Sequence, residues 1–350
     1  MVTAVQVGAR TVGAGWPCFV IAEAGVNHNG SVELACQLAT TARDCGADAV
    51  KFQTFKADKL VTLEAPKAEY QRAATPNGES QFDMLRALEL SDASHRVILE
   101  HCRKIGILFL STPFDEASAD LLEVLGVPAF KVSSGELTNL GLLAHIARKG
   151  KPIILSTGMA DLTEVEQAVA TIRQTGNGEV VLLQCVTNYP AAPADVNLRA
   201  MATMAQAFQV PVGYSDHTIG NQVAFASVAL GACVLEKHFT LSRDLPGPDQ
   251  KASIEPQELA ELVRGIRVVE AAIGNGRKEP AASEAASSAM ARRSLVAAAT
   301  IPAGAVLTES LVTTRRPGTG LPPNMRGQVV GRMARVLIPE GTVISLTMLA

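Results

Sequence analysis

The chain has 350 residues, 47% of them hydrophobic and 19% charged, which is enough for one large domain or two unequal ones with a sizeable core. Its 31 Lys and Arg nearly balance 34 Asp and Glu, and a net charge of −3 argues against a nucleic-acid surface, which needs a clustered basic excess. The longest apolar stretches are too short to cross a bilayer, so we expect no membrane segment.

Eight short apolar runs alternate with amphipathic helical stretches over most of the chain. Each run turns polar at its C-terminal end, and the runs begin at Phe19, Ala49, Ile107, Ala129, Pro152, Val180, Pro211 and Cys233. The stretches between them, such as 32–47 and 94–106, place apolar residues at i, i+3, i+4 and i+7, as amphipathic helices do. Eight strand–helix units with buried parallel strands predict an α/β fold, a (β/α)₈ TIM barrel, over residues 1–275.

An open doubly wound sheet is the main alternative to the barrel. A sheet of that kind that binds a dinucleotide carries GxGxxG after its first strand, whereas this chain has GVNHNG there. The barrel is therefore preferred, with one irregularity: the polar segment 58–80 lengthens the connection between the second and third strands.

The composition changes near residue 275. Residues 276–291 are polar, small and proline-bearing, which predicts a linker. Residues 292–350 contain two similar phrases, IPAGAVL and IPEGTVI, each a strand–turn–strand signature with Pro and Gly in the turn. A β-rich segment of this size is small for independent stability, so we expect it to dock on another surface.

Cysteine usage and the N-terminus bear on the compartment. The six cysteines lie far apart without a CxxC pair, which fits neither a disulfide framework nor a zinc ribbon and suits a reducing compartment. The first 25 residues lack a basic start followed by a long apolar run, so we expect no signal peptide. These features predict a cytoplasmic protein.

Polar side chains gather at the C-terminal ends of the predicted strands, where a (β/α)₈ barrel has its active site. They are Glu23, Asn27, His28, Lys51, Gln53, Ser111, Thr112, Lys131, Ser133, Ser134, Glu136, Ser156, Thr157, Thr187, Asn188, Tyr189, Ser215, Asp216, His217, Glu236, Lys237 and His238. A set this polar predicts a ligand site at that end of the barrel.

Lys51 and Lys131 lie within buried strands and need anionic partners, because an unpaired buried ammonium group is very costly. One interpretation is a pair of internal salt bridges with Glu23, Glu136 or Glu236. The other is a bound phosphate or carboxylate ringed by Ser and Thr hydroxyls, and the number of hydroxyls favours it.

His217 and His238 end adjacent strands, so their imidazoles would converge at the barrel mouth, with Glu23 nearby. Imidazole with carboxylate or water suits Mn, Fe, Co or Zn, and an open metal site would act as a Lewis acid on a bound carbonyl. The residues alone therefore predict an anion-binding, metal-assisted barrel enzyme without fixing its reaction.

A series of motifs carries a family resemblance across nearly the whole chain. In order they are AEAGVNHNGS, KFQTFKADKLV, STPFD, FKVSSGE, LSTGMA, NYPAAP, GYSDHT, LEKHFT, GPDQKAS and RRPGTG. Together they resemble the sialic acid synthase family, which makes nine-carbon 2-keto sugar acids, and residues 292–350 resemble its antifreeze-like (SAF) domain. Any one motif alone would be weak, but this order of motifs is highly specific.

The resemblance implies a transferase that condenses phosphoenolpyruvate with the open-chain aldehyde of an N-acetylated mannose-type sugar. His217 and His238 would hold Mn²⁺ or Mg²⁺, which polarises the aldehyde. Glu23 would orient the metal-bound water or the sugar, and Glu136 is a second acid/base or sugar-binding candidate. Water attack at C2 then gives a tetrahedral intermediate that expels phosphate by C–O cleavage.

The resemblance also assigns substrate contacts. Those to the phosphate and carboxylate of phosphoenolpyruvate would come from Lys51, Thr112, Lys131, Ser134, Ser156, Thr187 and Ser215, with Asn188 an alternative to Thr187. Gln53, Tyr189 and Asp249 would contact the sugar. The family swaps its C-terminal domain between the subunits of a homodimer, so Arg316 would reach the partner's barrel and touch the sugar's N-acetyl group. Without the resemblance, Arg315 and Arg316 indicate an ordinary solvated turn.

Two amino sugars remain open as substrates. Family members using N-acetylmannosamine often carry HQTH where this chain has KFQTF, and they lack the segment through APKAEYQ. The chain looks closer to the branch that handles 2,4-diacetamido-2,4,6-trideoxymannose, the legionaminic acid precursor. Two other functions compete: a metal-dependent hydrolase on the same barrel, which should show HxH after the first strand, and a non-catalytic sugar-binding protein.

Overall fold

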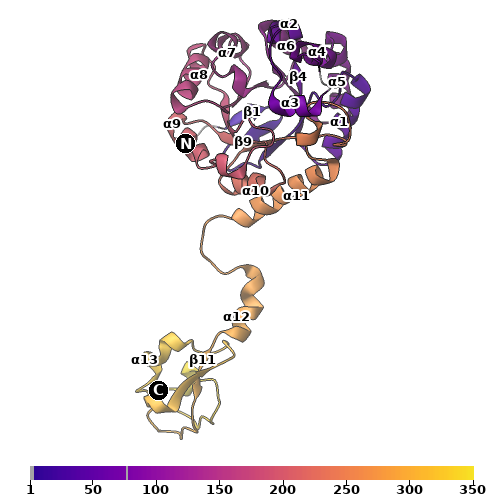
Figure 1. Ribbon diagram of the computed structural model, residues 1–350. Helices are drawn as coiled ribbons and strands as arrows, with labels where there is room; N and C mark the ends of the chain where they lie inside the picture. Colours follow the sequence, from indigo (N-terminus) through magenta and orange to yellow (C-terminus); the bar gives the residue numbers. More distant parts are fainter. Residues whose placement is uncertain (1–3, 76–77) are drawn as a thin grey trace. The chain divides into compact units, whose positions relative to one another are not determined.

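The computed structural model describes residues 4–75 and 78–350 (Figure 1). Its largest sheet consists of β3 (Phe19–Gly25), β4 (Ala49–Thr54), β5 (Leu108–Pro113), β6 (Phe130–Val132), β7 (Ile153–Ser156), β8 (Val180–Cys185), β9 (Val212–Asp216) and β10 (Val234–His238). These strands pair in parallel in the order β5-β4-β3-β10-β9-β8-β7-β6. β5 and β6, at the two ends of this order, contact each other, so the sheet is a nearly closed barrel. All eight predicted strands are confirmed.

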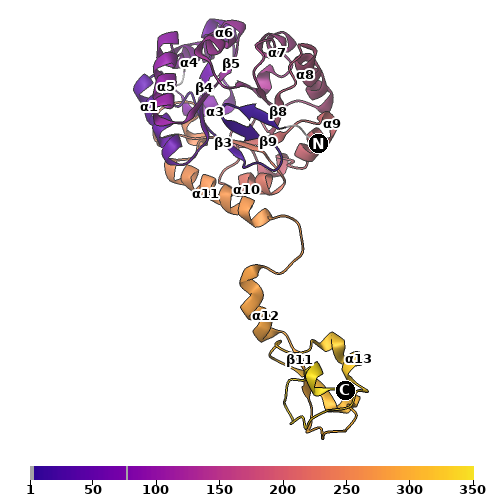
Figure 2. The same ribbon diagram turned by 180° about the vertical axis from the view of Figure 1, so that it is seen from behind.

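Helices surround the strands, which lie in the middle of the ring (Figures 1 and 2). The ring consists of α1 (Val32–Asp44), α5 (Asp92–Ile105), α6 (Glu116–Leu125), α7 (Leu140–Ala147), α8 (Leu162–Gln174), α9 (Ala200–Phe208), α10 (Gln222–Ala229) and α11 (Pro256–Ile273). Several begin where the sequence supplies a cap: Ser31 accepts a hydrogen bond from the Leu34 N–H, and Asp161 forms a capping box with Glu164. The predicted (β/α)₈ architecture is thus confirmed.

The long β4–β5 connection has structure of its own. It contains α2 (Ala57–Leu60), α3 (Glu69–Ala74) and α4 (Gln81–Leu88). A further hairpin, β1 (Val5–Val7) with β2 (Arg10–Val12), was not predicted. It buries Val5, Val7 and Val12 against the inward-facing apolar residues of the barrel strands, such as Phe19 and Ile21. The polar residues lie at the C-terminal ends of the strands.

The chain divides into two compact units, one ending at Gly274 and the other spanning Asn275–Ala350. The second contains α12 (Ala285–Ala291), α13 (Arg326–Val329) and the antiparallel strands β11 (Ser294–Ala297) and β12 (Val312–Arg315). The two similar phrases found in the sequence pair with each other, since Ile301 and Ile338 exchange backbone hydrogen bonds of 2.8 and 2.9 Å. The prediction of a small β-rich domain is confirmed.

The described part of the chain contains no helix that is both long and apolar enough to cross a membrane.

Candidate active site

A cavity of about 840 Å³ opens at the C-terminal ends of the barrel strands. Its lining includes most of the residues predicted for the site: Glu23, Lys51, Gln53, Thr112, Lys131, Ser134, Ser156, Thr187, Tyr189, Ser215, His217 and His238. Asn188 lines it as well, so Thr187 and Asn188 both remain candidates for the same role. The fold therefore brings together side chains from every strand of the barrel.

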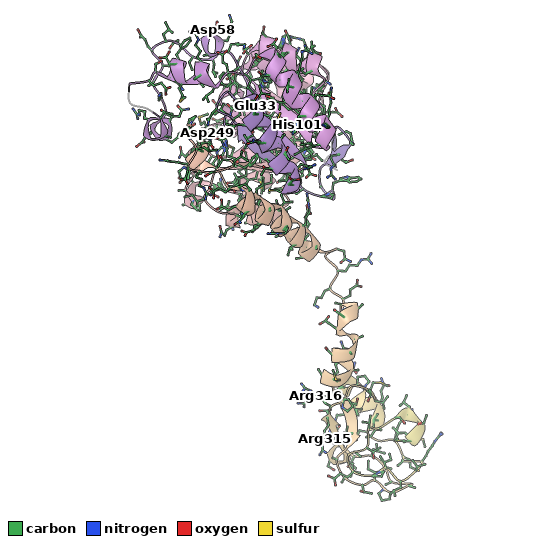
Figure 3. All side chains as sticks on the ribbon, turned by 90° about the vertical axis from the view of Figure 1, so that its right-hand side faces the viewer. Glu33, Asp58, His101, Asp249, Arg315 and Arg316 are labelled. Carbon is green, nitrogen blue, oxygen red and sulfur yellow. The ribbon has the colours of Figure 1, made fainter. Side chains whose placement is uncertain are left out.

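Three residues that were given a catalytic or substrate-binding role lie outside this lining, and so do the strand-end residues Asn27, His28, Ser111, Thr157, Asp216 and Lys237. Glu136, in the short helix η1 (Ser134–Glu136), accepts a hydrogen bond of 2.8 Å from Asn139. Asp249 is buried in the barrel unit at the start of η3 (Gln250–Ala252). Arg316 belongs to the C-terminal unit, where its Nε donates to the Ala291 carbonyl at 2.9 Å. Figure 3 shows Asp249 in one unit and Arg315 and Arg316 in the other.

Two ammonium groups and two carboxylates form the floor of the cavity. Lys51 Nζ lies 2.7 Å from Glu23 Oε2 and 3.8 Å from Glu236 Oε2, and Lys131 Nζ lies 3.5 Å from Glu236 Oε1. All four side chains are buried. The predicted internal salt bridges are present with Glu23 and Glu236 and not with Glu136, and the binding of an anionic ligand by the same lysines stays a prediction. Pairing of this kind is what permits such charges to be buried.

Hydroxyl groups complete the surroundings of the two lysines. Lys51 Nζ donates to Thr112 Oγ1 at 3.0 Å, and Lys131 Nζ donates to Ser156 Oγ at 2.7 Å. Ser215 Oγ donates to Glu236 Oε1 at 3.0 Å. The buried Thr187 Oγ1 has no hydrogen-bond partner among the described residues. The two ammonium groups and the neighbouring hydroxyl groups form a surface that can bind phosphate or carboxylate oxygens.

The two carboxylates differ in proton affinity. Burial raises the pKa of Glu23 to about 7, with the Lys51 ammonium opposing the rise and Glu236 adding to it. Burial acts on Glu236 in the same direction, but Lys131 and Lys51 outweigh it and hold the pKa of Glu236 below its ordinary value. Glu23 is consequently the carboxyl group that exchanges a proton near neutral pH, as an acid/base catalyst must.

His217 and His238 face each other with ring centroids 5.5 Å apart. His217 Nδ1 donates to the Val186 carbonyl at 2.6 Å, so Nε2 carries the lone pair when the ring is neutral. Burial lowers the pKa of His217, but Cys185 and the Val186 carbonyl outweigh burial and raise this pKa above its ordinary value. His238 Nδ1 is buried without a hydrogen-bond partner among the described residues, and burial lowers the pKa of His238 well below its ordinary value. A neutral imidazole with an unused nitrogen fits a divalent cation. No group of three or more His, Cys, Asp or Glu in metal-binding geometry occurs in the described ranges, so water or substrate would fill the other positions.

Two of the predicted sugar contacts, Gln53 and Tyr189, line the cavity, and the third in this unit, Asp249, is buried outside the lining. The Tyr189 ring lies 4.1 Å from the His217 ring and 5.5 Å from the His238 ring, and Gln53 Nε2 donates to Glu23 Oε1 at 3.4 Å. Burial raises the pKa of Asp249 to about 6, opposed by His217 and by a hydrogen bond with Tyr70. An aromatic face beside amide and carboxyl groups suits a sugar with apolar and hydroxyl faces.

Asp249 is fixed in position by a hydrogen-bonded bridge from the loop after β3. Asn27 Nδ2 donates to Ser253 Oγ and to the Phe239 carbonyl, both at 2.9 Å, and Ser253 Oγ donates to the Asp249 carbonyl at 2.7 Å. Phe239 directly follows His238, so the buried Asn27 amide connects the backbone next to His238 with the backbone of Asp249.

Sequence reasoning missed several residues of the cavity wall. Glu236 was listed among the strand-end residues but was given no role in the reaction, although it pairs with both lysines. Tyr70, Phe114 and Met159 also line the cavity. Tyr70 belongs to the polar connection between β4 and β5, where no strand-end pattern indicates a functional residue.

Family models and known relatives match this chain over most of its length. Residues 38–278 match the model of the NeuB family, and residues 292–350 match that of the SAF domain. The chain is 47% identical to the N,N'-diacetyllegionaminic acid synthase of Legionella pneumophila over 96% of either chain, and 48% identical to that of Campylobacter jejuni over 90% of this chain and 95% of the relative. The crystal structure of an N-acetylneuraminic acid synthetase from Leptospira borgpetersenii covers 82% of this chain and 95% of its own, with a TM-score of 0.72 and 33% identity.

Proposed function

The chain belongs to the NeuB family, and on that premise we propose that it is a phosphoenolpyruvate-dependent nonulosonic acid synthase that makes legionaminic acid. The observation that carries the proposal is the identity of 47% and 48%, over at least 90% of both chains, to two N,N'-diacetyllegionaminic acid synthases. The acceptor would be 2,4-diacetamido-2,4,6-trideoxymannose, with N-acetylmannosamine as the second candidate.

Lys51 and Lys131 would bind the phosphate and carboxylate of phosphoenolpyruvate, assisted by the surrounding hydroxyl groups. The four charges on the cavity floor balance one another, whereas the donor brings a net negative charge. Its binding therefore requires Lys51 to turn from Glu23 toward the donor.

His217 and His238 would hold the divalent cation. Two imidazole nitrogens suit Mn²⁺ better than Mg²⁺, which prefers oxygen ligands. The cation, when bound, supplies Lewis acidity toward the aldehyde oxygen. The hydrogen bond from His217 Nδ1 to Val186 keeps the ring in the orientation and tautomer that ligation needs.

The reaction forms a bond between C3 of phosphoenolpyruvate and the aldehyde carbon, and the aldehyde oxygen gains a proton. Water then adds to C2, and the C–O bond to the phosphate breaks, so that phosphate leaves and a 2-keto acid remains. Glu23 would accept the proton of the attacking water or orient the sugar, and Glu136 remains a second acid/base candidate. Tyr189, Gln53 and Asp249 would hold the acceptor.

The C-terminal SAF domain would complete the site of a second subunit. We assign residues 1–275 to the catalytic domain, 276–291 to the linker and 292–350 to the SAF domain. In a domain-swapped homodimer, Arg316 would contact the N-acetyl group of the acceptor in the partner's barrel. The exposed guanidinium and its flanking turn are consistent with such a contact.

Phosphate release from phosphoenolpyruvate tests this function. The assay compares the two amino sugars in the presence of Mn²⁺, with and without a chelator. Chelator-sensitive release that requires the diacetamido sugar supports the proposal, and release with N-acetylmannosamine alone assigns the other substrate. Release with neither sugar, in folded protein, returns weight to the hydrolase or to the sugar-binding protein.

A further inference from the structure

The segment between β4 and β5 forms part of the cavity wall. Ala68, Glu69 and Tyr70, at the start of α3, belong to the cavity lining. In both Figure 1 and Figure 2, α3 projects onto the middle of the helical ring rather than onto its rim. The chain therefore places a short helix across the mouth of its own barrel.

A buried ion pair fixes this helix. Lys67 Nζ donates to Glu79 Oε2 at 2.7 Å and to Thr75 Oγ1 at 2.8 Å, and the Lys67 side chain is only 5% exposed. The Ala68 N–H donates to Gln71 Oε1 at 3.0 Å, which caps the first turn. These contacts link the residues just before α3 to those just after it, so Tyr70 is held in place.

Tyr70 continues a row of rings that starts at the imidazoles. Its ring lies 5.1 Å from the Tyr189 ring, which in turn lies 4.1 Å from His217. The reacting aldehyde carbon must lie at the two imidazoles if these hold the cation. Tyr70 is one ring farther out, where the remote carbons of an acceptor extending toward the mouth would lie.

The two candidate acceptors differ at those remote carbons. Both carry the aldehyde and the 2-acetamido group, but one has hydroxyls at C4 and C6 where the other has an acetamido group and a methyl group. A tyrosine ring gives favourable contacts to methyl groups, whereas hydroxyls placed against it lose hydrogen bonds to water.

We infer that Tyr70 determines acceptor specificity, by packing its ring against the C4–C6 end of the diacetamido sugar. The inference rests on the proposed function and adds a residue to it. The Tyr70 hydroxyl interacts with Gln71, whose Nε2 donates to it at 3.3 Å, and with Asp249. The ring, rather than the hydroxyl, is the part of Tyr70 that would contact the C4–C6 end of the sugar.

The test compares kcat/KM for both sugars, and KM for phosphoenolpyruvate, in the wild-type chain and in Tyr70→Ala, Tyr70→Phe and Tyr70→Asn. Alanine is the best helix former, so α3 is retained in the first variant. Leu63→Ala, an exposed position of the same segment, is the matched control.

We expect Tyr70→Ala to lose about tenfold or more in kcat/KM for the diacetamido sugar, with a much smaller loss for N-acetylmannosamine and an unchanged KM for phosphoenolpyruvate. Tyr70→Phe keeps the preference, and Tyr70→Asn shifts it toward N-acetylmannosamine.

Equal losses for both sugars, or an unchanged preference in Tyr70→Ala and Tyr70→Asn, overturn the inference while leaving the proposed function intact. A wild-type chain that turns over neither sugar overturns both.

Discussion

Glu23 and Lys51 lie directly opposite each other in the register of β3 and β4, with Glu23 Oε2 and Lys51 Nζ 2.7 Å apart. Both side chains are buried at the end of the barrel where the substrates would bind. The strand register therefore fixes this pair. The pair joins Lys51, which is proposed to bind the donor, to a carboxyl group that titrates near neutral pH.

Replacing this carboxyl group, as in Glu23→Gln, should lower kcat/KM by about 10²-fold or more, because acid/base catalysts contribute on that scale. In the wild-type chain, kcat/KM should rise with pH through the pKa of about 7 and then level off. The variant should lack this rise. The exposed Glu33→Gln on α1 is the control (Figure 3), and an unchanged rise in Glu23→Gln would contradict the role.

The same pKa affects stability. The folded chain keeps a proton on Glu23 between about pH 4.5, the ordinary value, and pH 7, whereas the unfolded chain has released it. The contribution of Glu23 to the free energy of unfolding should therefore fall as pH rises through this window. Denaturant unfolding at pH 5 and pH 8 should show Glu23→Gln losing less stability than the wild type; equal losses would contradict the raised pKa.

The second lysine allows binding to be separated from stability. Lys131→Met leaves Glu236 with Lys51 alone at 3.8 Å, so the free energy of unfolding should fall by about 3 kcal/mol. KM for phosphoenolpyruvate should rise at least about tenfold. The double variant Lys131→Met with Glu236→Gln should regain stability but not donor binding. Recovery of donor binding in the double variant would show that Lys131 serves only to neutralise Glu236.

The histidine pair makes a prediction about metal binding that does not depend on turnover. His217→Ala and His238→Ala should each weaken Mn²⁺ binding at least about tenfold in calorimetric titrations. His101→Ala on α5 lies away from the cavity and is the control. Mn²⁺ binding of unchanged affinity in both site variants would place the cation elsewhere.

The swapped arginine can be tested by mixing subunits. Arg316→Ala should raise KM for the sugar about tenfold or more and leave KM for phosphoenolpyruvate unchanged, with Arg315→Ala as the control. Co-refolding Arg316→Ala with His238→Ala chains should produce activity with the wild-type KM for the sugar, because one site in each mixed dimer combines an intact barrel with an intact Arg316. A mixture that shows only the raised KM would contradict the swap.

The sequence predicts the barrel well because each strand is a buried apolar run whose polar end marks one face. The sequence does not predict elements that lack this apolar pattern. The β1–β2 hairpin has only three residues per strand, and α3 lies in a polar segment without apolar periodicity. Tyr70 was missed for the same reason.

Strand-end position also identified most of the residues that line the cavity, but not how their charges pair. Whether Lys131 contacts Glu236 or Glu136 depends on the direction in which β6 ends and on the local turn of η1. Those are three-dimensional properties, so the sequence left the lysine partners open. In the proposed domain-swapped dimer, Arg316 would reach the barrel of a second subunit, which one chain cannot specify.

The most direct test of the proposed synthase is the product itself. Purified protein with Mn²⁺, phosphoenolpyruvate and 2,4-diacetamido-2,4,6-trideoxymannose should yield a nine-carbon 2-keto acid, identified by mass spectrometry, in a 1:1 ratio with phosphate. Phosphate that appears without the sugar, or a sugar that is consumed without the nine-carbon acid, would contradict the carbon–carbon bond formation on which the whole account rests.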